Sequence, residues 1–111
     1  MKDIIVYEDF DKLDMRVGKI IEASAPDWSN KLLEFKVDFG EEIGTRTILS
    51  GIKQWYDPED FIGKKYPFIV NLKERKMGPS MSQGMMIMAD SEERPTVFPV
   101  DNSIPAGCVV C

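Results

Sequence analysis

Apolar and charged residues alternate most regularly between positions 33 and 39. The apolar positions are Leu33, Phe35, Val37 and Phe39, and the charged ones are Glu34, Lys36 and Asp38. Side chains of a β-strand point to opposite faces in turn, so a period of two predicts a strand with one buried face. This segment is the strongest strand signal in the chain.

Four more segments have strand composition. They are apolar, partly β-branched, and bounded by turn residues: 15–25, 45–50, 65–71 and 84–90. Gly18 lies inside the first of them, and an internal glycine commonly marks a bulge or bend that curls a sheet into a small barrel. Pro67 predicts an edge position or a bulge in the fourth. The apolar run 84–90 is uninterrupted, which predicts a buried fifth strand.

The remaining segments predict short helices, a loop and a terminal hairpin. Asp9 suits the cap of one helical turn over 9–13, and Asp57, Pro58 and Gly63 suit the cap, first position and exit of a second helix over 56–63. Residues 73–83 contain Gly78-Pro79 and two serines and predict a loop. We expect 96–100 and 108–111 to form a last hairpin.

Five strands, a bend in the first and a short helix between the third and fourth describe a five-stranded OB-fold barrel. The expected class is all-β with short helices and a C-terminal β extension. A length of 111 residues suits one domain over 1–111, with an N-terminal segment (1–14), a barrel (15–90) and an extension (91–111).

Composition narrows the possible chemistry. The chain has no histidine, so Ser-His-Asp and Cys-His nucleophile systems cannot form within it. Cys108 and Cys111 are the only cysteines, and their C-x-x-C spacing on a strand would point them to opposite faces, as for reduced structural thiols. We expect no enzyme, no metal and no cofactor. Apolar runs are too short to cross a membrane, and acidic residues from Asp3 onward argue against a signal peptide, so we expect a cytoplasmic protein.

Charge is unevenly distributed along the chain. The net charge is −5, yet residues 64–89 carry five basic groups against Glu74 alone. A basic segment in an acidic chain attracts a polyanion locally while the remainder repels it. The alternative is a solvated charged loop.

Several stretches together resemble one family. They are Leu13-Asp-Met-Arg-Val-Gly-Lys-Ile20, Lys31-Leu-Leu33, Val37-Asp-Phe-Gly40, Arg46-Thr-Ile-Leu-Ser-Gly-Ile52, Pro58-Glu59, Gly63-Lys64, Val70-Asn-Leu-Lys-Glu-Arg-Lys-Met-Gly78 and Ser82-Gln-Gly-Met-Met-Ile-Met-Ala89. The chain resembles the tRNA-binding domain that ends bacterial methionyl-tRNA synthetases and also exists as free-standing dimers. N-L-x-x-R-K followed closely by S-x-G-M is the most specific combination. Many members carry a histidine-containing loop before K-L-L, where this chain has the shorter Pro26–Asn30 and no histidine.

The resemblance implies an OB-fold that binds tRNA by shape and without catalysis, alone or in trans with an aminoacyl-tRNA synthetase. It also implies a homodimer that uses Ile4, Ile5, Val6, Phe10 and residues 96–111. CsaA-type export chaperones form a sister group with the same D-x-R-V-G start. They typically lack R-T-I-x-S-G-I and S-Q-G-M, which this chain keeps, and this points to the tRNA-binding branch. A chaperone that binds unfolded polypeptide is the alternative function.

The predicted RNA contacts follow the family pattern after the fourth strand. They are Asn71, Lys73, Arg75, Lys76, Ser82, Gln83 and Met85. Lys and Arg would contact phosphates, and Arg could also stack on a base. The amides and the hydroxyl suit a base edge or a 2′-hydroxyl, and Met85 offers an apolar face to an unstacked base.

Other residues have two interpretations each. Lys31, Lys36 and Lys53 extend a basic track if they share the same face, and are otherwise plain surface. Arg16 either lines the groove or pairs with an acidic neighbour. Trp28 and Trp55 suit stacking on bases, although packing beneath the short helix is the better interpretation for Trp55. Five methionines between 77 and 88 suit a peptide-binding surface, whereas those of a buried strand belong to the core.

Overall fold

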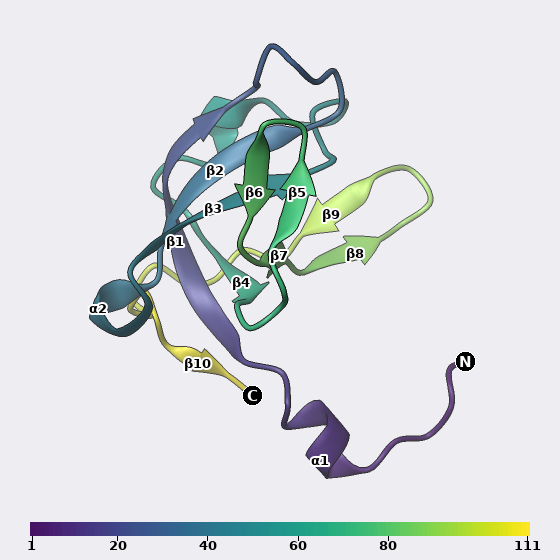
Figure 1. The fold of residues 1–111 in the computed structure, drawn as a ribbon. Coiled ribbons are helices and arrows are strands. Elements are labelled where there is room, and N and C mark those ends of the chain that lie inside the picture. The colour runs from purple at the N-terminus through teal and green to yellow at the C-terminus, as the bar shows by residue number, and fades with distance from the viewer.

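A computed structural model describes residues 1–111. Five antiparallel strands lie in the order β3-β2-β1-β4-β7 and form a nearly closed barrel (Figure 1). Their bounds are Met15–Ser24 (β1), Leu33–Asp38 (β2), Thr45–Ser50 (β3), Lys65–Ile69 (β4) and Met85–Met86 (β7). The barrel is nearly closed between β3 and the segment before β7, where the Gln83 backbone N–H donates to the Thr47 carbonyl at 2.8 Å. The predicted OB-type architecture is confirmed.

β1 curves because it pairs with β4 over its first half and with β2 over its second. The register with β2 shifts between Ile20 and Glu22, as expected for a bulged and bent strand. Gly18 lies just before this point. A Cβ there would approach Val37 Cγ1 to 2.5 Å and Phe39 Cε1 to 2.6 Å, so only glycine lets the strand pass this close to the core.

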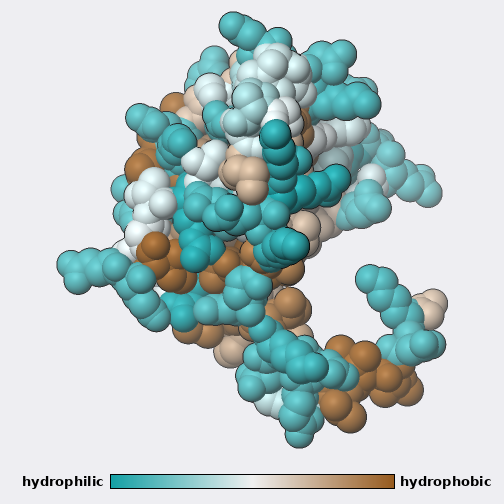
Figure 2. All heavy atoms as spheres, viewed as in Figure 1, coloured by the Kyte–Doolittle hydropathy of each residue, from teal (hydrophilic) through white to brown (hydrophobic).

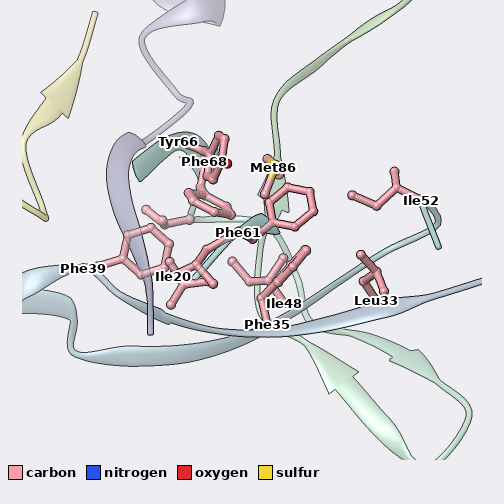
Figure 3. Close-up of a cluster of buried hydrophobic side chains, with 12 residues drawn as sticks. Ile20, Leu33, Phe35, Phe39, Ile48, Ile52, Phe61, Tyr66, Phe68 and Met86 are labelled. Atoms are coloured by element: carbon pink, nitrogen blue, oxygen red, sulfur yellow. The ribbon is translucent and has the colours of Figure 1, made fainter. Parts of the chain in front are cut away.

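Twelve buried residues fill the barrel (Figure 3). β2 supplies the alternate positions Leu33, Phe35 and Val37, which confirms its predicted buried face. Phe61 follows the 3₁₀ turn η1 (Pro58–Asp60), whose predicted cap is confirmed by the reciprocal Asp57–Asp60 capping box. The Phe61 ring lies 4.9 Å from Phe35 between centroids. The helix predicted over 56–63 is therefore this shorter 3₁₀ turn.

The structure corrects the predicted second half. The loop predicted over 73–83 contains a hairpin of β5 (Arg75–Met77) and β6 (Ser80–Ser82). The strand predicted over 84–90 is split, because β7 pairs with β4 whereas β8 (Met88–Asp90) leaves the barrel and pairs with β9 (Pro95–Val97). The predicted terminal hairpin is wrong, since β10 (Val109–Val110) pairs with the start of β1.

Two four-residue helices complete the chain. α1 is Tyr7–Phe10, two residues earlier than the expected turn, and α2 is Gly40–Ile43, where a hairpin connection was expected. The N-terminal arm, residues 1–10, extends away from the barrel on the side where the chain ends (Figure 1). Hydrophobic atoms are exposed along it, with Ile4 at 88% (Figure 2). No helix in this chain combines the length and apolarity that a membrane crossing requires.

Candidate nucleic-acid interface

The β5–β6 hairpin lies across the outer face of β2 and β3, and hydrophilic atoms cover it (Figures 1 and 2). Ser80 and Trp28 make two of the contacts that hold it there. Ser80 Oγ donates to Glu34 Oε1 at 2.8 Å, and the Trp28 ring lies directly against Gly78 at the hairpin turn. Gly78 has φ of +58°, and a Cβ there would lie 2.5 Å from the ring. The short Pro26–Asn30 loop therefore supports the hairpin through Trp28.

Lys73, Arg75 and Lys76 are exposed on this hairpin and the turn before it. None of them takes part in the three ion pairs of the chain. Arg75 is paired in register with Ser82, and Lys76 with Met81, which places two cations on β5 beside the S-Q-G-M stretch. Arg75 and Lys76 are consecutive on β5 and therefore point to its two sides, and we call the exposed surface that they and Lys73 form around the hairpin the basic face.

Ser82 and Gln83, both predicted RNA contacts, bond to the barrel. Ser82 is 3% exposed, and its Oγ accepts from the Leu49 N–H and donates to the Gly84 carbonyl, both at 3.1 Å. Gln83 Oε1 accepts from the Thr47 N–H at 2.9 Å, and its Nε2 donates to Glu74 at 3.3 Å. The oxygen of each side chain thus accepts from a β3 backbone N–H and joins the hairpin to β3, whereas the donated bonds go to Gly84 and Glu74.

Asn71 is also engaged within the protein. Its Nδ2 donates to the Lys12 carbonyl at 2.6 Å, and its Oδ1 accepts from the Asp14 N–H at 2.8 Å. Both polar atoms of the amide therefore tie the end of β4 to the N-terminal segment. In this arrangement Asn71 positions the chain that leads into the basic face.

Arg46 is a residue of this region that the sequence did not single out. Its Nη1 donates to the Val70 carbonyl and, at 3.3 Å, to the Gln83 carbonyl. These two carbonyls are at the start and the end of the segment that carries the basic face. One guanidinium therefore bridges the two ends of that segment, and the R-T-I motif is the sequence signal that contains it.

Met85 is 49% exposed and lines a shallow apolar hollow of about 500 Å³ together with Met77, Met86 and Met88. Met86 is buried at 3% and belongs to the core, as expected for a methionine of the inner strand. The exposed methionines thus place an apolar surface beside the cations.

The other predicted lysines differ in their surroundings. Lys31 is exposed, whereas Lys36 Nζ donates to Thr47 Oγ1 at 2.6 Å and Lys53 Nζ donates to the Ser29 carbonyl at 3.2 Å. Lys36 belongs to β2 and donates to β3, on the face where the hairpin lies. Lys31 and Lys53 join the loop before β2 to the segment after β3 through a backbone bond of 3.1 Å.

Arg16 does not offer a free cation. Its Nε lies 2.6 Å from Asp14 Oδ1 and its Nη1 lies 3.1 Å from Glu42 Oε1. Hydrogen bonds to Asp14, and then to Glu42, raise the pKa of the guanidinium above its already high value. Of the two interpretations, the ion pair is confirmed.

No cluster of three metal-ligating side chains exists in the chain, and both cysteines are free and exposed. The polar chemistry of this face therefore consists of exposed cations, an apolar patch and a rigid hydrogen-bonded support. Such a surface can bind an anion by charge and an unstacked ring by apolar contact.

Comparison with known proteins identifies the family. Residues 15–108 match the family described as "Putative tRNA binding domain". The chain belongs to this tRNA-binding domain family. The resemblance seen in the motifs is confirmed.

Relatives of three kinds share the domain. A methionine–tRNA ligase of Streptococcus pyogenes is 42% identical over 98% of the chain, which spans 16% of that ligase's length. A "MetRS related protein" from Pyrococcus horikoshii is 36% identical, with a TM-score of 0.93 over 99% of this chain and 100% of the other. The CsaA chaperone protein of Picrophilus torridus is 27% identical, with a TM-score of 0.89 over 97% and 100%.

Proposed function

We propose that this chain is a non-catalytic, structure-specific tRNA-binding protein that uses the basic face. The observation that carries the proposal is the group of three exposed, unpaired cations on a hairpin that Ser82, Gln83 and Arg46 fix to the barrel. A backbone that is already held in place adds no ordering cost when the cations contact phosphates, and each contact releases counterions. The family membership of the chain supports the same ligand.

Filter binding with tRNA over a salt series tests this function. Three or more phosphate contacts predict a slope of log affinity against log salt of about −2 to −4. Duplex RNA and single-stranded RNA of equal length serve as comparisons, because recognition of tRNA shape requires weaker binding to both. Equal affinity for all three RNAs would contradict shape recognition, and a slope near zero would contradict binding through the cations.

Arg46 tests whether the support of the hairpin matters. We expect Arg46→Met to weaken tRNA binding about tenfold. Each charge-assisted hydrogen bond is worth about 1.5–3 kcal/mol, and the loss of these bonds loosens the hairpin that carries the cations. The salt slope should stay unchanged, because no phosphate contact is removed. Both bonds come from Nη1, and a lysine ammonium can also donate to two carbonyls, so Arg46→Lys should retain more binding than Arg46→Met. A shallower slope would show instead that Arg46 itself contacts phosphate.

The second candidate function is that of a CsaA-like chaperone. The methionine-lined hollow beside the basic face supports it, because flexible thioether side chains adapt to varied peptides. The two functions separate by competition. If an unfolded polypeptide displaces labelled tRNA only weakly, tRNA binding is supported. If the polypeptide binds and tRNA does not, the chaperone function is correct.

We further propose a homodimer, acting alone or in trans with an aminoacyl-tRNA synthetase. The exposed apolar arm supports the dimer, because large apolar side chains on an extended segment need a partner surface. Ile5→Asp should halve the mass measured by light scattering, whereas Ile21→Asp, at an exposed position on the barrel, should leave it unchanged. A wild-type chain that is monomeric at micromolar concentration would contradict the dimer.

A further inference from the structure

A hollow of about 460 Å³ lies away from the basic face, between η1, β4 and the β8–β9 hairpin. Trp55, Tyr66 and Val97 line the hollow, and so do two cationic residues, Lys64 and Arg94. The volume is within the range of about 300–1,000 Å³ that is typical of small-ligand sites. None of the predicted RNA contacts lines it, so it constitutes a separate site.

Tyr66 gives this hollow a polar group that the fold does not use. The residue is 3% exposed and its ring packs 5.5 Å from Phe61 between centroids (Figure 3). The hydroxyl has no hydrogen-bond partner within the protein. Every side-chain oxygen or nitrogen that is sealed from solvent does have a partner, so the Tyr66 hydroxyl is not sealed. The hydroxyl must therefore open into the hollow that Tyr66 lines. Burial, and then the charge of Asp60, raises the pKa of Tyr66, so the hydroxyl is a proton donor at neutral pH.

Arg94 is held in place over the opposite side. Its guanidinium lies 5.4 Å from the centroid of the Tyr56 ring, within the range of a cation–π contact. The hydroxyls of Ser91 and Thr96 both donate to the Arg94 carbonyl, and Tyr56 Oη donates to the neighbouring Pro95 carbonyl at 2.7 Å. The backbone that carries Arg94 is thus fixed to the aromatic wall before any ligand arrives.

The charges of the hollow select an anion. Lys64 and Arg94 supply two positive charges against the single carboxylate of Asp60, and neither cation forms an ion pair. This balance disfavours a cationic ligand, although aromatic walls alone would suit one. Trp55, Phe61 and Val97 instead offer flat, apolar contact to a planar ring. A planar heterocycle that carries a phosphate meets all of these requirements.

We propose that this hollow binds a nucleotide, with the base against Trp55 and Val97, a hydrogen bond from Tyr66, and the phosphate between Lys64 and Arg94. The site goes beyond tRNA binding at the basic face and shares no residue with it. The same chemistry is offered by a free nucleotide and by the terminal nucleotide of a single-stranded RNA. Titration with 5′-AMP and with a trinucleotide of single-stranded RNA distinguishes these two sources.

Tryptophan fluorescence provides the measurement. Trp28 and Trp55 are the only tryptophans, so the Trp28→Phe protein reports on the hollow through Trp55 alone. We expect 5′-AMP to quench this emission saturably, with a dissociation constant in the millimolar range or below. Adenosine, which lacks the phosphate, and ribose 5-phosphate, which lacks the base, should each bind about tenfold more weakly or worse, because each loses about 1.4 kcal/mol or more of contact.

Two variants assign the binding to the named residues. Tyr66→Phe removes only the hydroxyl and should weaken 5′-AMP binding about fivefold, and Lys64→Gln should do so by a similar factor. Lys73→Gln should leave 5′-AMP affinity unchanged, and Tyr66→Phe, which removes no charge, should leave the salt slope of tRNA binding unchanged. A failure of the nucleotide-binding proposal is therefore distinguishable from a failure of the proposal that the basic face binds tRNA. Lys64 is exposed, so Lys64→Gln still gives a result if Tyr66→Phe alters folding.

The proposal is overturned if 5′-AMP gives no saturable quenching, or if Lys64→Gln and a folded Tyr66→Phe both bind as the parent does. A trinucleotide of single-stranded RNA, titrated in the same way, identifies the source. Quenching by 5′-AMP alone assigns the site to free nucleotides. Quenching by both ligands, each weakened in Lys64→Gln, assigns it to the end of an RNA chain as well.

Discussion

Phe61→Ala is expected to lower the free energy of unfolding by about 4 kcal/mol. The Phe61 side chain is 1% exposed, and its ring centroid lies within 5.5 Å of those of Phe35, Tyr56 and Tyr66. Truncation removes three aromatic contacts at once and leaves a cavity that the barrel strands cannot close. Because Phe61 joins the turn after β3 to the barrel interior, its loss should also weaken the packing beneath the nucleotide site.

Urea unfolding followed by circular dichroism measures this loss. The midpoint should fall while the dependence of the unfolding free energy on urea stays constant, as for a change in stability alone. Ile62→Ala is the matched control, since Ile62 is the next residue and is 50% exposed. It should cost less than about 1 kcal/mol. Equal losses in the two variants would show that Phe61 is not a centre of core packing.

Local pattern predicted the first half of the barrel because each strand there carries its own signal. β2 alternates strictly, and one face of it faces the core. The Gly18 bend was predictable since glycine in a strand marks a position where a side chain does not fit, and three core side chains meet there.

The second half could not be predicted in the same way, because its strands are two or three residues long. Three residues such as Arg75–Met77 contain too few positions to show a period. The apolar residues 85–89 indicate burial of the strand predicted over 84–90 but do not show which strand it pairs with, so the change of partner between β7 and β8 could not be predicted. Pairing of β10 with β1 is a contact between the two ends of the chain and leaves no local trace.

The candidate site was predicted by residue type but not by orientation. Ser82, Gln83 and Asn71 have the right groups for a base edge, yet each group bonds to the protein's own backbone or side chains. Sequence shows that a donor exists and not whether it is already used. Their role as RNA contacts stays a prediction, whereas the exposed cations are available as expected.

This division has a physical consequence. Asn71, Ser82 and Gln83 use their polar groups for hydrogen bonds within the protein, and these bonds hold the backbone of the basic face in one geometry. The three cations of the basic face lie on that backbone and form no ion pair. Long basic side chains lose rotamer freedom when they bind, and a rigid backbone confines that loss to the side chains themselves. Affinity should therefore depend on the cations, and discrimination between RNA shapes on the support.

Neutralising Lys73, Arg75 and Lys76 together to glutamine is expected to weaken tRNA binding about 100-fold or more near 0.1 M salt. Each phosphate contact contributes about 0.7–0.9 to the salt slope, so the slope should become shallower by about 2 to 3. The three side chains are exposed and form no ion pair, so the unfolding free energy should change little. Filter binding over the salt series, with urea unfolding of the same protein, measures both effects.

A second triple variant separates local from overall charge. Lys2, Lys12 and Lys19 are exposed, and their replacement by glutamine changes the net charge by the same amount. If the basic face binds the phosphates, this control should lose less than about threefold in affinity and keep its salt slope. If both triples weaken binding equally, the attraction comes from total charge. If tRNA binding survives the first triple intact, the basic face is not the interface.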